Sequence, residues 1–191
     1  MLPVLRETGC LFVTSAVESI DDTVLEHLRK GHTRAGFVRA VSLCRDAGLT
    51  LAPTFVPFTP WTTREGYAEL IELLDTLDLI DHVAPIQLAI RLLITAGSPL
   101  LELPDIRRAV SEFDPASLTC PWVHADPAVD ALQQQVMTLV AGSAHAPRLQ
   151  TFRGIAALAG TEPRARRPFG RLLPPTLSEP WYCCAEPLET F

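Results

Sequence analysis

Apolar residues in the first 110 positions occur in short runs typical of strands, separated by stretches with helical spacing. The run at residues 10–15, Cys-Leu-Phe-Val-Thr-Ser, favours an extended strand. A second run covers residues 49–58, and its prolines at positions 53 and 57 predict a strand that is irregular or ends early. A third apolar run covers residues 82–94, and we expect its first half to be another strand.

Six other segments carry the apolar spacing and the end signals of helices. Asp21 with Asp22, and then Thr33, are typical N-cap residues at the start of two of them. Thr62 begins a Thr-x-x-Glu sequence, which predicts a capping box at the start of a third. The predicted helices cover residues 21–30, 33–48 and 62–77, a short segment from Pro104, residues 126–140 and residues 150–159.

The order of these elements predicts an α/β fold. Alternating strands and helices imply parallel strands joined by crossover helices. About three parallel strands are too few for a complete sheet, so we expect a partial (β/α) barrel, followed by further helices and an extended Pro-rich tail. The expected parts are a half-barrel at 1–110, a helical extension at 111–160, and a tail at 161–191 that holds six of the 17 prolines.

Composition narrows the functional classes. The chain has 191 residues, a formal net charge of −6 and 48% hydrophobic residues, which favours a globular protein and argues against a general nucleic-acid binder. No apolar run approaches the ~20 residues of a membrane span, so we expect a cytoplasmic protein without a membrane partner. The five cysteines form neither a disulfide framework nor a CxxC, CxxxCxxC or HExxH motif.

Polar residues follow each predicted strand, where parallel α/β folds bind ligands. Ser15, Glu18 and Ser19 follow the first strand; the alternative for Glu18 and Ser19 is that they help to cap the next helix. Gln87 and Arg91 lie in the third apolar run, and Arg91 needs a partner there, either a ligand carboxylate or Glu18.

Three other groups of residues are candidate sites. The turn at 59–63, Thr-Pro-Trp-Thr-Thr, follows the second strand; its tryptophan suits a lid over the core, and its threonines suit helix caps. His32 and His82 fit loop or capping positions better than metal sites. The adjacent Cys183 and Cys184 in the tail suit thiol chemistry, such as a vicinal disulfide, soft-metal capture or substrate reduction.

Several of these segments resemble the radical SAM family. Residues 13–19, Val-Thr-Ser-Ala-Val-Glu-Ser, followed by Lys-Gly-His-Thr at 30–33, look like the middle of a radical SAM domain. The turn at 58–63 departs from the Gly-Pro-Gly-Glu-like turn of many relatives. The sequence Cys-Cys-Ala-Glu-Pro at 183–187 resembles the CUAEP/CCAEP-tail radical SAM (seleno)proteins, some of which have selenocysteine at the position of Cys184.

This resemblance, which extends from about residue 8 to residue 187, implies a cofactor set and a partner. It implies S-adenosylmethionine and a 4Fe–4S cluster, and in related architectures a cobalamin-binding domain before the barrel. It places Ser15, Glu18, Ser19, Gln87 and Arg91 near S-adenosylmethionine or substrate, and makes Cys183 and Cys184 a catalytic redox pair. Because CxxxCxxC is lacking, we expect a C-terminal portion, inactive alone, whose N-terminal half is supplied by the same gene or a separate chain. The alternative is a non-enzymatic half-barrel that docks on a partner and presents its cysteine pair to a metal or a thiol.

Overall fold

Two parallel strands form the sheet of this protein, for which a computed structural model describes residues 2–143 and 145–164. Strand β1 (Phe12–Glu18) pairs with β2 (Thr50–Phe55) in a register that sets Thr14 opposite Ala52. The register shifts between Ala16 and Glu18, so β1 has an irregularity at its carboxyl end. A mixed α/β fold with parallel strands is therefore confirmed.

The helices between these strands begin where the cap residues predict. The Asp21 carboxylate accepts the N–H groups of Thr23 and Val24 and begins α2 (Asp22–His27). Thr33 accepts the N–H of Gly36 and begins α3 (Arg34–Asp46). Each side chain satisfies donors that the first helical turn leaves unpaired. A further helix, α1 (Leu2–Glu7), precedes the sheet and was not predicted.

The predicted capping box at Thr62 is wrong by one residue. Thr63 caps α4 (Arg64–Thr76) and accepts the N–H of Gly66. The Thr62 hydroxyl instead donates to the carbonyl of Pro57 and accepts the N–H of Thr59. Thr62 therefore stabilises the turn after β2, a contact that the local spacing does not reveal.

The predicted third strand is also wrong. The 3-10 helix η1 (Ile80–His82) ends at the first residue of this run, and a second 3-10 helix, η2 (Pro85–Leu88), occupies its first half. Pro85 has no N–H for a sheet and fits the first turn of η2. One parallel bridge remains beyond η2, in which Phe58 donates to the carbonyl of Ile90 at 3.2 Å and accepts the N–H of Leu92 at 2.8 Å. The apolar character of this run reflects burial and not strand formation.

The later helices confirm the remaining predictions. Helix η3 (Pro99–Glu102) precedes α5 (Pro104–Ala109), and Asp126 caps α6 (Pro127–Ala141). Helix α7 (Arg148–Ala159) begins two residues before the predicted start. Beyond residue 164, the predicted tail lies outside the described residues.

The buried apolar side chains of the described residues form two separate hydrophobic cores. The main core joins the sheet, α3 and α4 to α6 and α7, and includes Leu74, Val136 and Ile155. Helices α6 and α7, which belong to the predicted extension, thus share a core with the predicted half-barrel. A smaller core joins Ile94, Ile106, Cys120 and Trp122, and we call residues 92–123 the satellite lobe.

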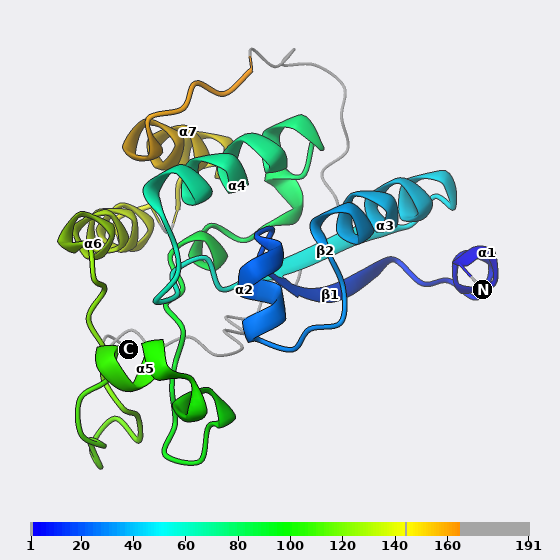
Figure 1. The fold of residues 1–191 in the computed structure, drawn as a ribbon. Helices are drawn as coiled ribbons and strands as arrows, with labels where there is room; N and C mark the ends of the chain where they lie inside the picture. Colours follow the sequence, from blue (N-terminus) through cyan, green and yellow to red (C-terminus); the bar gives the residue numbers. More distant parts are fainter. Residues whose placement is uncertain (1, 144, 165–191) are drawn as a thin grey trace.

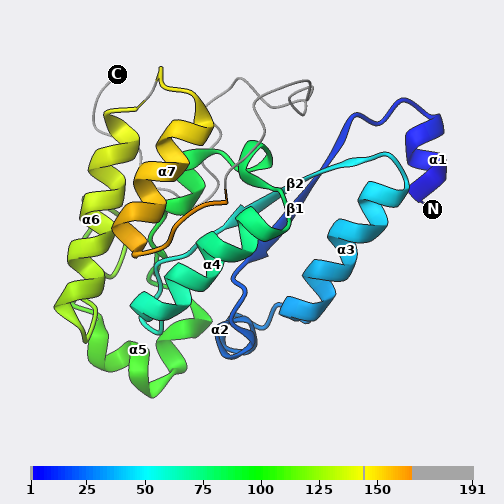
Figure 2. The same ribbon diagram turned by 90° about the horizontal axis from the view of Figure 1, so that it is seen from above.

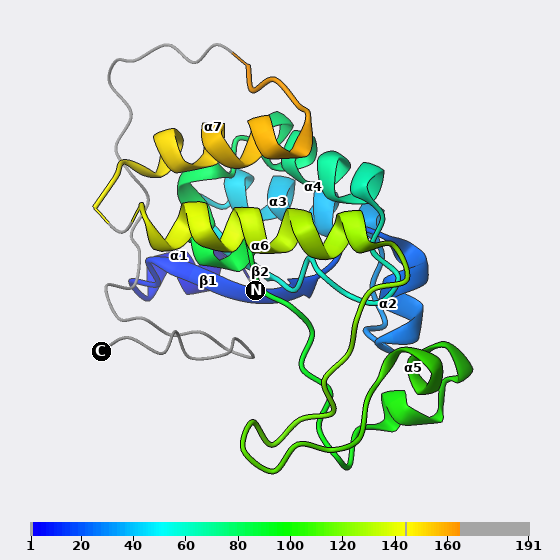
Figure 3. The ribbon, with the colours of Figure 1, turned by 90° about the vertical axis from the view of Figure 1, so that its left-hand side faces the viewer.

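The helices cover the sheet unequally. Figures 1 and 2 show α4, α6 and α7 grouped together, and in Figure 3 these helices and α3 lie on one side of the sheet. The row of Leu51, Pro53 and Phe55 is buried on that side. The opposite row includes Thr14 and Ala16, which are exposed, and Thr54, which is half-buried.

None of the helices in the described ranges combines the length and the apolar character that a membrane crossing needs.

Candidate functional site

Glu18 forms the carboxyl end of β1 in an unusual backbone conformation. Its φ is +66°, in the left-handed region that residues other than glycine seldom adopt. Its carbonyl accepts the N–H of Val56 at 2.9 Å, and its carboxylate pairs with the Lys30 ammonium at 2.7 Å. The pair is partly buried, since the side chains of Lys30 and Glu18 are 30% and 18% exposed. The Glu-Ser sequence at 18–19 and the Lys-Gly-His-Thr sequence at 30–33 thus meet at the carboxyl end of β1.

His32 ties the same motif to the strand. One ring nitrogen, Nε2, lies 3.1 Å from the carbonyl of Val17, and the other, Nδ1, lies 3.3 Å from the carbonyl of Lys30. His82 similarly contacts the carbonyl of Leu51 through Nδ1 at 2.8 Å. Both histidines therefore contact backbone carbonyls, as expected of structural residues.

The two serines lie near Glu18 but have different surroundings. Ser19 accepts the N–H of Asp21 through its hydroxyl at 3.0 Å, which supports the helix-capping interpretation. Ser15 pairs in register with Pro53 and lies between Val13 and Val17 in the strand. Because side chains alternate along a strand, Ser15 shares the core-facing row and not the open one.

Gln87 has a structural partner in the end of β2. Its side chain is buried, and Oε1 accepts the N–H of Phe55 at 3.2 Å. This bond satisfies the last backbone donor of the strand, which would be costly to bury unpaired. The Gln87 side chain therefore pairs with the backbone at the end of β2, where a neighbouring third strand would otherwise supply the acceptor.

Arg91 pairs with Asp130 and not with Glu18, which was one of its two expected partners. Its guanidinium donates from Nη1 to Asp130 Oδ1 at 2.6 Å and from Nη2 to the carbonyl of Trp122 at 2.6 Å. The guanidinium carbon also lies 3.5 Å from the centre of the Trp122 ring, in a cation–π contact. Arg91 therefore joins the main core to the satellite lobe.

The turn after β2 is held by its threonines and presents Trp61. Trp61 donates its backbone N–H to Thr59 Oγ1 at 3.3 Å. Its ring stacks on His27 with a centroid distance of 4.4 Å and packs against the satellite core. The expectation that Trp61 covers core residues is confirmed.

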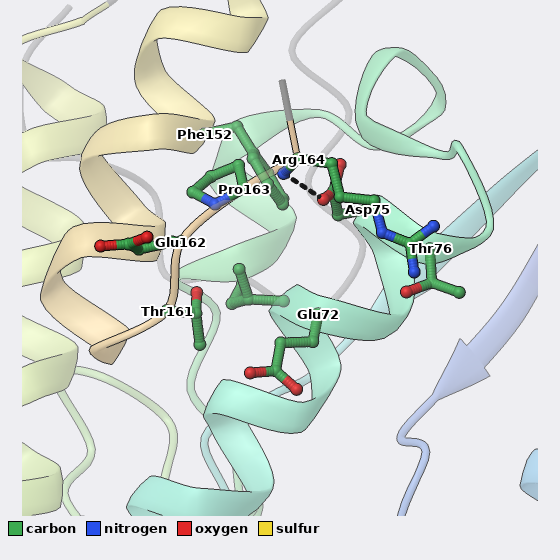
Figure 4. Close-up of a pocket in the computed structure, with 9 residues that line it drawn as sticks. Glu72, Asp75, Thr76, Phe152, Thr161, Glu162, Pro163 and Arg164 are labelled. Carbon is green, nitrogen blue, oxygen red and sulfur yellow. Dashed lines mark hydrogen bonds between the residues drawn. The ribbon is translucent and has the colours of Figure 1, made fainter. Parts of the chain in front are cut away.

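Two cavities flank α4. One, of about 210 Å³, lies between α4, α7 and residues 161–164 (Figure 4). Figure 4 shows Asp75 accepting the backbone N–H of Arg164, a bond of 2.8 Å, beside Phe152 and Glu72. The other, of about 320 Å³, lies at the amino ends of α2, α3 and α4, where Arg34 pairs with Glu69 at 2.7 Å. Among the described residues, Ser15, Glu18, Ser19, Gln87 and Arg91 line neither cavity.

Two buried ionisable groups, Tyr67 and Cys44, belong to the main core. Burial raises the pKa of Tyr67 above its ordinary value, and its hydroxyl donates to the carbonyl of Leu88 at 2.9 Å. Burial also raises the pKa of the Cys44 thiol, which disfavours the reactive thiolate.

The described residues do not fit a 4Fe–4S cluster. Residues 2–143 and 145–164 contain no group of three potential metal ligands, and Cys10, Cys44 and Cys120 are separate free thiols. Cys183 and Cys184 lie outside the described residues, so their predicted redox role stays a prediction.

Sequence reasoning missed three residues that the fold brings to this region, namely Trp122, His124 and Asp130. Asp130 Oδ2 accepts the backbone N–H of His124 at 3.0 Å, while Oδ1 pairs with Arg91. One signal was present, because an unpaired arginine in an apolar run requires a carboxylate from another element. No local spacing indicates that this carboxylate comes from α6.

No protein-family model matches this chain, and no curated protein does either.

Proposed function

We propose that this chain forms the later part of a radical SAM barrel that acts on S-adenosylmethionine, as the sequence resemblance implies. The observation that carries the proposal is the 2.7 Å pair between Glu18 and Lys30. These residues belong to the two motif elements that resemble the family, and they meet at the carboxyl end of a parallel strand. Backbone strain of the kind at Glu18 is common at functional sites.

The open face of the sheet also supports this proposal. Parallel sheets occur almost only with both faces covered. Here Thr14 and Ala16 are exposed on the face opposite the main core. These small side chains suit the interior face of a barrel because they leave room for a ligand above the strands.

The proposal requires a second unit that carries the CxxxCxxC cluster motif. The described residues do not fit the cluster, so we place it, and any cobalamin, on a unit from the same gene or a separate chain. Glu18 and Ser19 would hold S-adenosylmethionine at the strand end, where this cofactor supplies the 5′-deoxyadenosyl group. Arg91 is already paired with Asp130 and serves there as a positioning residue.

The first test examines the DNA around the gene and then the complete complex. We expect a coding sequence with CxxxCxxC that is adjacent or in frame, and we expect the co-expressed protein to release 5′-deoxyadenosine from S-adenosylmethionine under anaerobic reduction. Glu18→Gln should lower that rate about tenfold, which corresponds to ~1.4 kcal/mol of activation free energy. Lys30→Met should have a similar effect because it removes the partner charge.

Glu7→Gln is the matched control, since Glu7 is exposed at the end of α1. Its rate should equal that of the parent protein. The proposal fails if no cluster-bearing unit is encoded, if a complex with its full iron content releases no 5′-deoxyadenosine, or if Glu18→Gln has the control rate.

The tail cysteines are proposed to form a redox pair in the completed enzyme. Adjacent thiols can close a strained disulfide that is readily reduced. We expect Cys183→Ser and Cys184→Ser each to abolish product turnover while leaving S-adenosylmethionine binding intact. Buried Cys44 supplies the control through Cys44→Ala. Unchanged turnover in both tail variants would contradict the redox role.

The alternative function is a binding module that docks on a partner and presents its cysteine pair to a metal or thiol. One observation favours it, namely that Glu18, Gln87 and Arg91 already have partners within the chain. Under this alternative the open sheet face binds a protein, and the Glu18 variant changes complex formation without changing any S-adenosylmethionine chemistry.

A further inference from the structure

The outer side of α4 carries a row of acidic side chains. Glu65, Glu69 and Glu72, which we call the acidic row of α4, recur at spacings of four and three residues and so share one face of the helix. All three residues are exposed. With Asp75, the helix has four acidic residues and one basic residue, Arg64. This face of the helix is therefore negatively charged.

Two carboxylates of the row lack a cation within the part of the chain that the structure describes. Glu69 pairs with Arg34 at 2.7 Å, whereas neither Glu65 nor Glu72 forms an ion pair with another described residue. Like charges that are neighbours on a helix repel one another and lower its stability. A cationic segment along the row would relieve this repulsion.

The chain itself brings a basic segment to one end of the row. Residues 161–164 follow α7 and reach α4, where the Asp75 carboxylate accepts the backbone N–H of Arg164 at 2.8 Å (Figure 4). The cavity of about 210 Å³ at this contact is also lined by Glu72. Arg164 therefore lies beside the carboxyl-terminal end of the acidic row.

The segment at 164–171 has the charge and the length to follow the row. It reads Arg-Ala-Arg-Arg-Pro-Phe-Gly-Arg, with four arginines and no acidic residue. An extended chain spans at most about 3.5 Å per residue, so Arg171 can lie up to ~25 Å from Arg164. Asp75 and Glu65 are ten residues apart on α4, which corresponds to about 15 Å along the helix. The segment is therefore long enough to reach both ends of the row.

The amino-terminal end of the row borders the second cavity that flanks α4. Its volume is about 320 Å³, and its charged lining residues are Asp21, Asp22, Glu65, Glu69 and Arg34. Four carboxylates thus face one guanidinium. The planar guanidinium of a second arginine can donate to two carboxylate oxygens at once, which suits this lining.

We propose that residues 164–171 dock along the acidic row of α4, with Arg167 at Glu72 and Arg171 in the 320 Å³ cavity. Residues 165–171 lie outside the described residues, and the contact at Asp75, the opposite charges and the reach of the chain support this placement. Exposed ion pairs are individually weak, but a tethered segment has a high effective concentration. A few such pairs favour the docked state about tenfold, and salt weakens it.

Docking in this direction brings the tail toward the candidate site. Helix α4 follows the turn after β2, so its amino end lies on the side of the carboxyl ends of the strands, where Glu18 is located. Cys183 is twelve residues beyond Arg171, a span of up to ~42 Å in an extended chain. A role of this route in delivering the cysteines rests on the proposed function, whereas the docking itself does not.

Carbodiimide cross-linking of the 191-residue chain tests the docking. The reagent joins an amine to a carboxylate in direct contact with it, and the chain has one lysine, Lys30. Arg167→Lys and Arg171→Lys therefore each add one side-chain amine without changing the charge. We expect position 167 to be joined to Glu72 and position 171 to a carboxylate of the 320 Å³ cavity, as identified by mass spectrometry of the peptides.

The same chain supplies the reference and the control. Lys30 and Glu18 lie 2.7 Å apart, so their cross-link should form equally in every variant. Glu72→Arg should lower the ratio of docked to undocked chain about tenfold, which halves the cross-link yield from position 171. Glu112→Arg makes the same charge change at an exposed residue of the satellite lobe and should leave this yield unchanged. About 0.5 M salt should lower the yield as Glu72→Arg does.

Three results would overturn the proposal. The first is a Lys30–Glu18 cross-link without any from positions 167 and 171. The second is an equal yield of cross-links from these positions to Glu72 and to Glu112. The third is covalent dimers joined through the same positions, because the row would then bind the tail of a second copy. None of these results depends on S-adenosylmethionine chemistry, so failure of the docking and failure of the proposed function are distinguishable.

Discussion

Replacing Ile106 with alanine should unfold the satellite lobe more readily while the main core stays intact. Ile106 is 0% exposed and packs in the smaller core with Ile94, Cys120 and Trp122. Truncation of a fully buried isoleucine costs about 3 kcal/mol through lost burial and the cavity left behind. The smaller core contains few other buried side chains. The lost free energy should therefore lower the free energy of local unfolding of the satellite lobe.

Amide hydrogen exchange measures the effect at individual sites. The N–H of Cys120, which donates to the carbonyl of Ile94, reports on the lobe, and the N–H of Leu79, which donates to Leu74, reports on the main core. In Ile106→Ala we expect the Cys120 amide to exchange about 100-fold faster, the equivalent of ~3 kcal/mol, with little change at Leu79. Ile155→Ala, in the main core, should accelerate exchange at both. Equal acceleration at both amides in Ile106→Ala would show that the two cores unfold as one.

Replacing Arg91 with methionine should weaken the junction between the lobe and α6. The change removes the pair with Asp130, the bond to the carbonyl of Trp122 and the cation–π contact with the Trp122 ring. It leaves a carboxylate that is 23% exposed without its partner. Loss of one member of a fully buried pair costs 3–5 kcal/mol, so for this partly buried pair we expect about 2 kcal/mol in the free energy of unfolding.

A double-mutant cycle measures the interaction energy between Arg91 and Asp130. Denaturant unfolding of Arg91→Met, Asp130→Asn and the double variant should give a coupling energy of about 1 kcal/mol. Arg34→Met with Glu69→Gln is the control cycle at an exposed pair, where we expect much weaker coupling. Additive effects at Arg91 and Asp130 would contradict the positioning role of this pair.

Local chemistry made several elements predictable. Asp21, Thr33 and Asp126 begin helices because each side chain accepts backbone N–H groups within three residues. The strand after residue 49 does end early, at Phe55 and before Pro57, as the prolines indicate. The contacts of His32 and His82 with backbone carbonyls agree with the prediction that they are structural.

Long-range contacts decided the features that the sequence did not predict. Residues 82–88 have the apolar composition of a buried strand, but Gln87 binds the end of β2 and Pro85 begins a 3-10 helix. The requirement of Arg91 for a partner was predictable, whereas its identity, Asp130, is 39 residues away.

The sequence by itself determined the α/β class, the helix starts and the polar strand end at Glu18, because caps, turns and hydrophobic periodicity act over a few residues. Tertiary structure alone decided that Lys30 pairs with Glu18, that the sheet of the described residues has two strands and not three, and that Trp61 and His124 line one cavity. These outcomes depend on which buried donors, charges and apolar faces meet when distant segments pack. Which of these contacts form depends on the free energy of the whole fold and not on any local pattern.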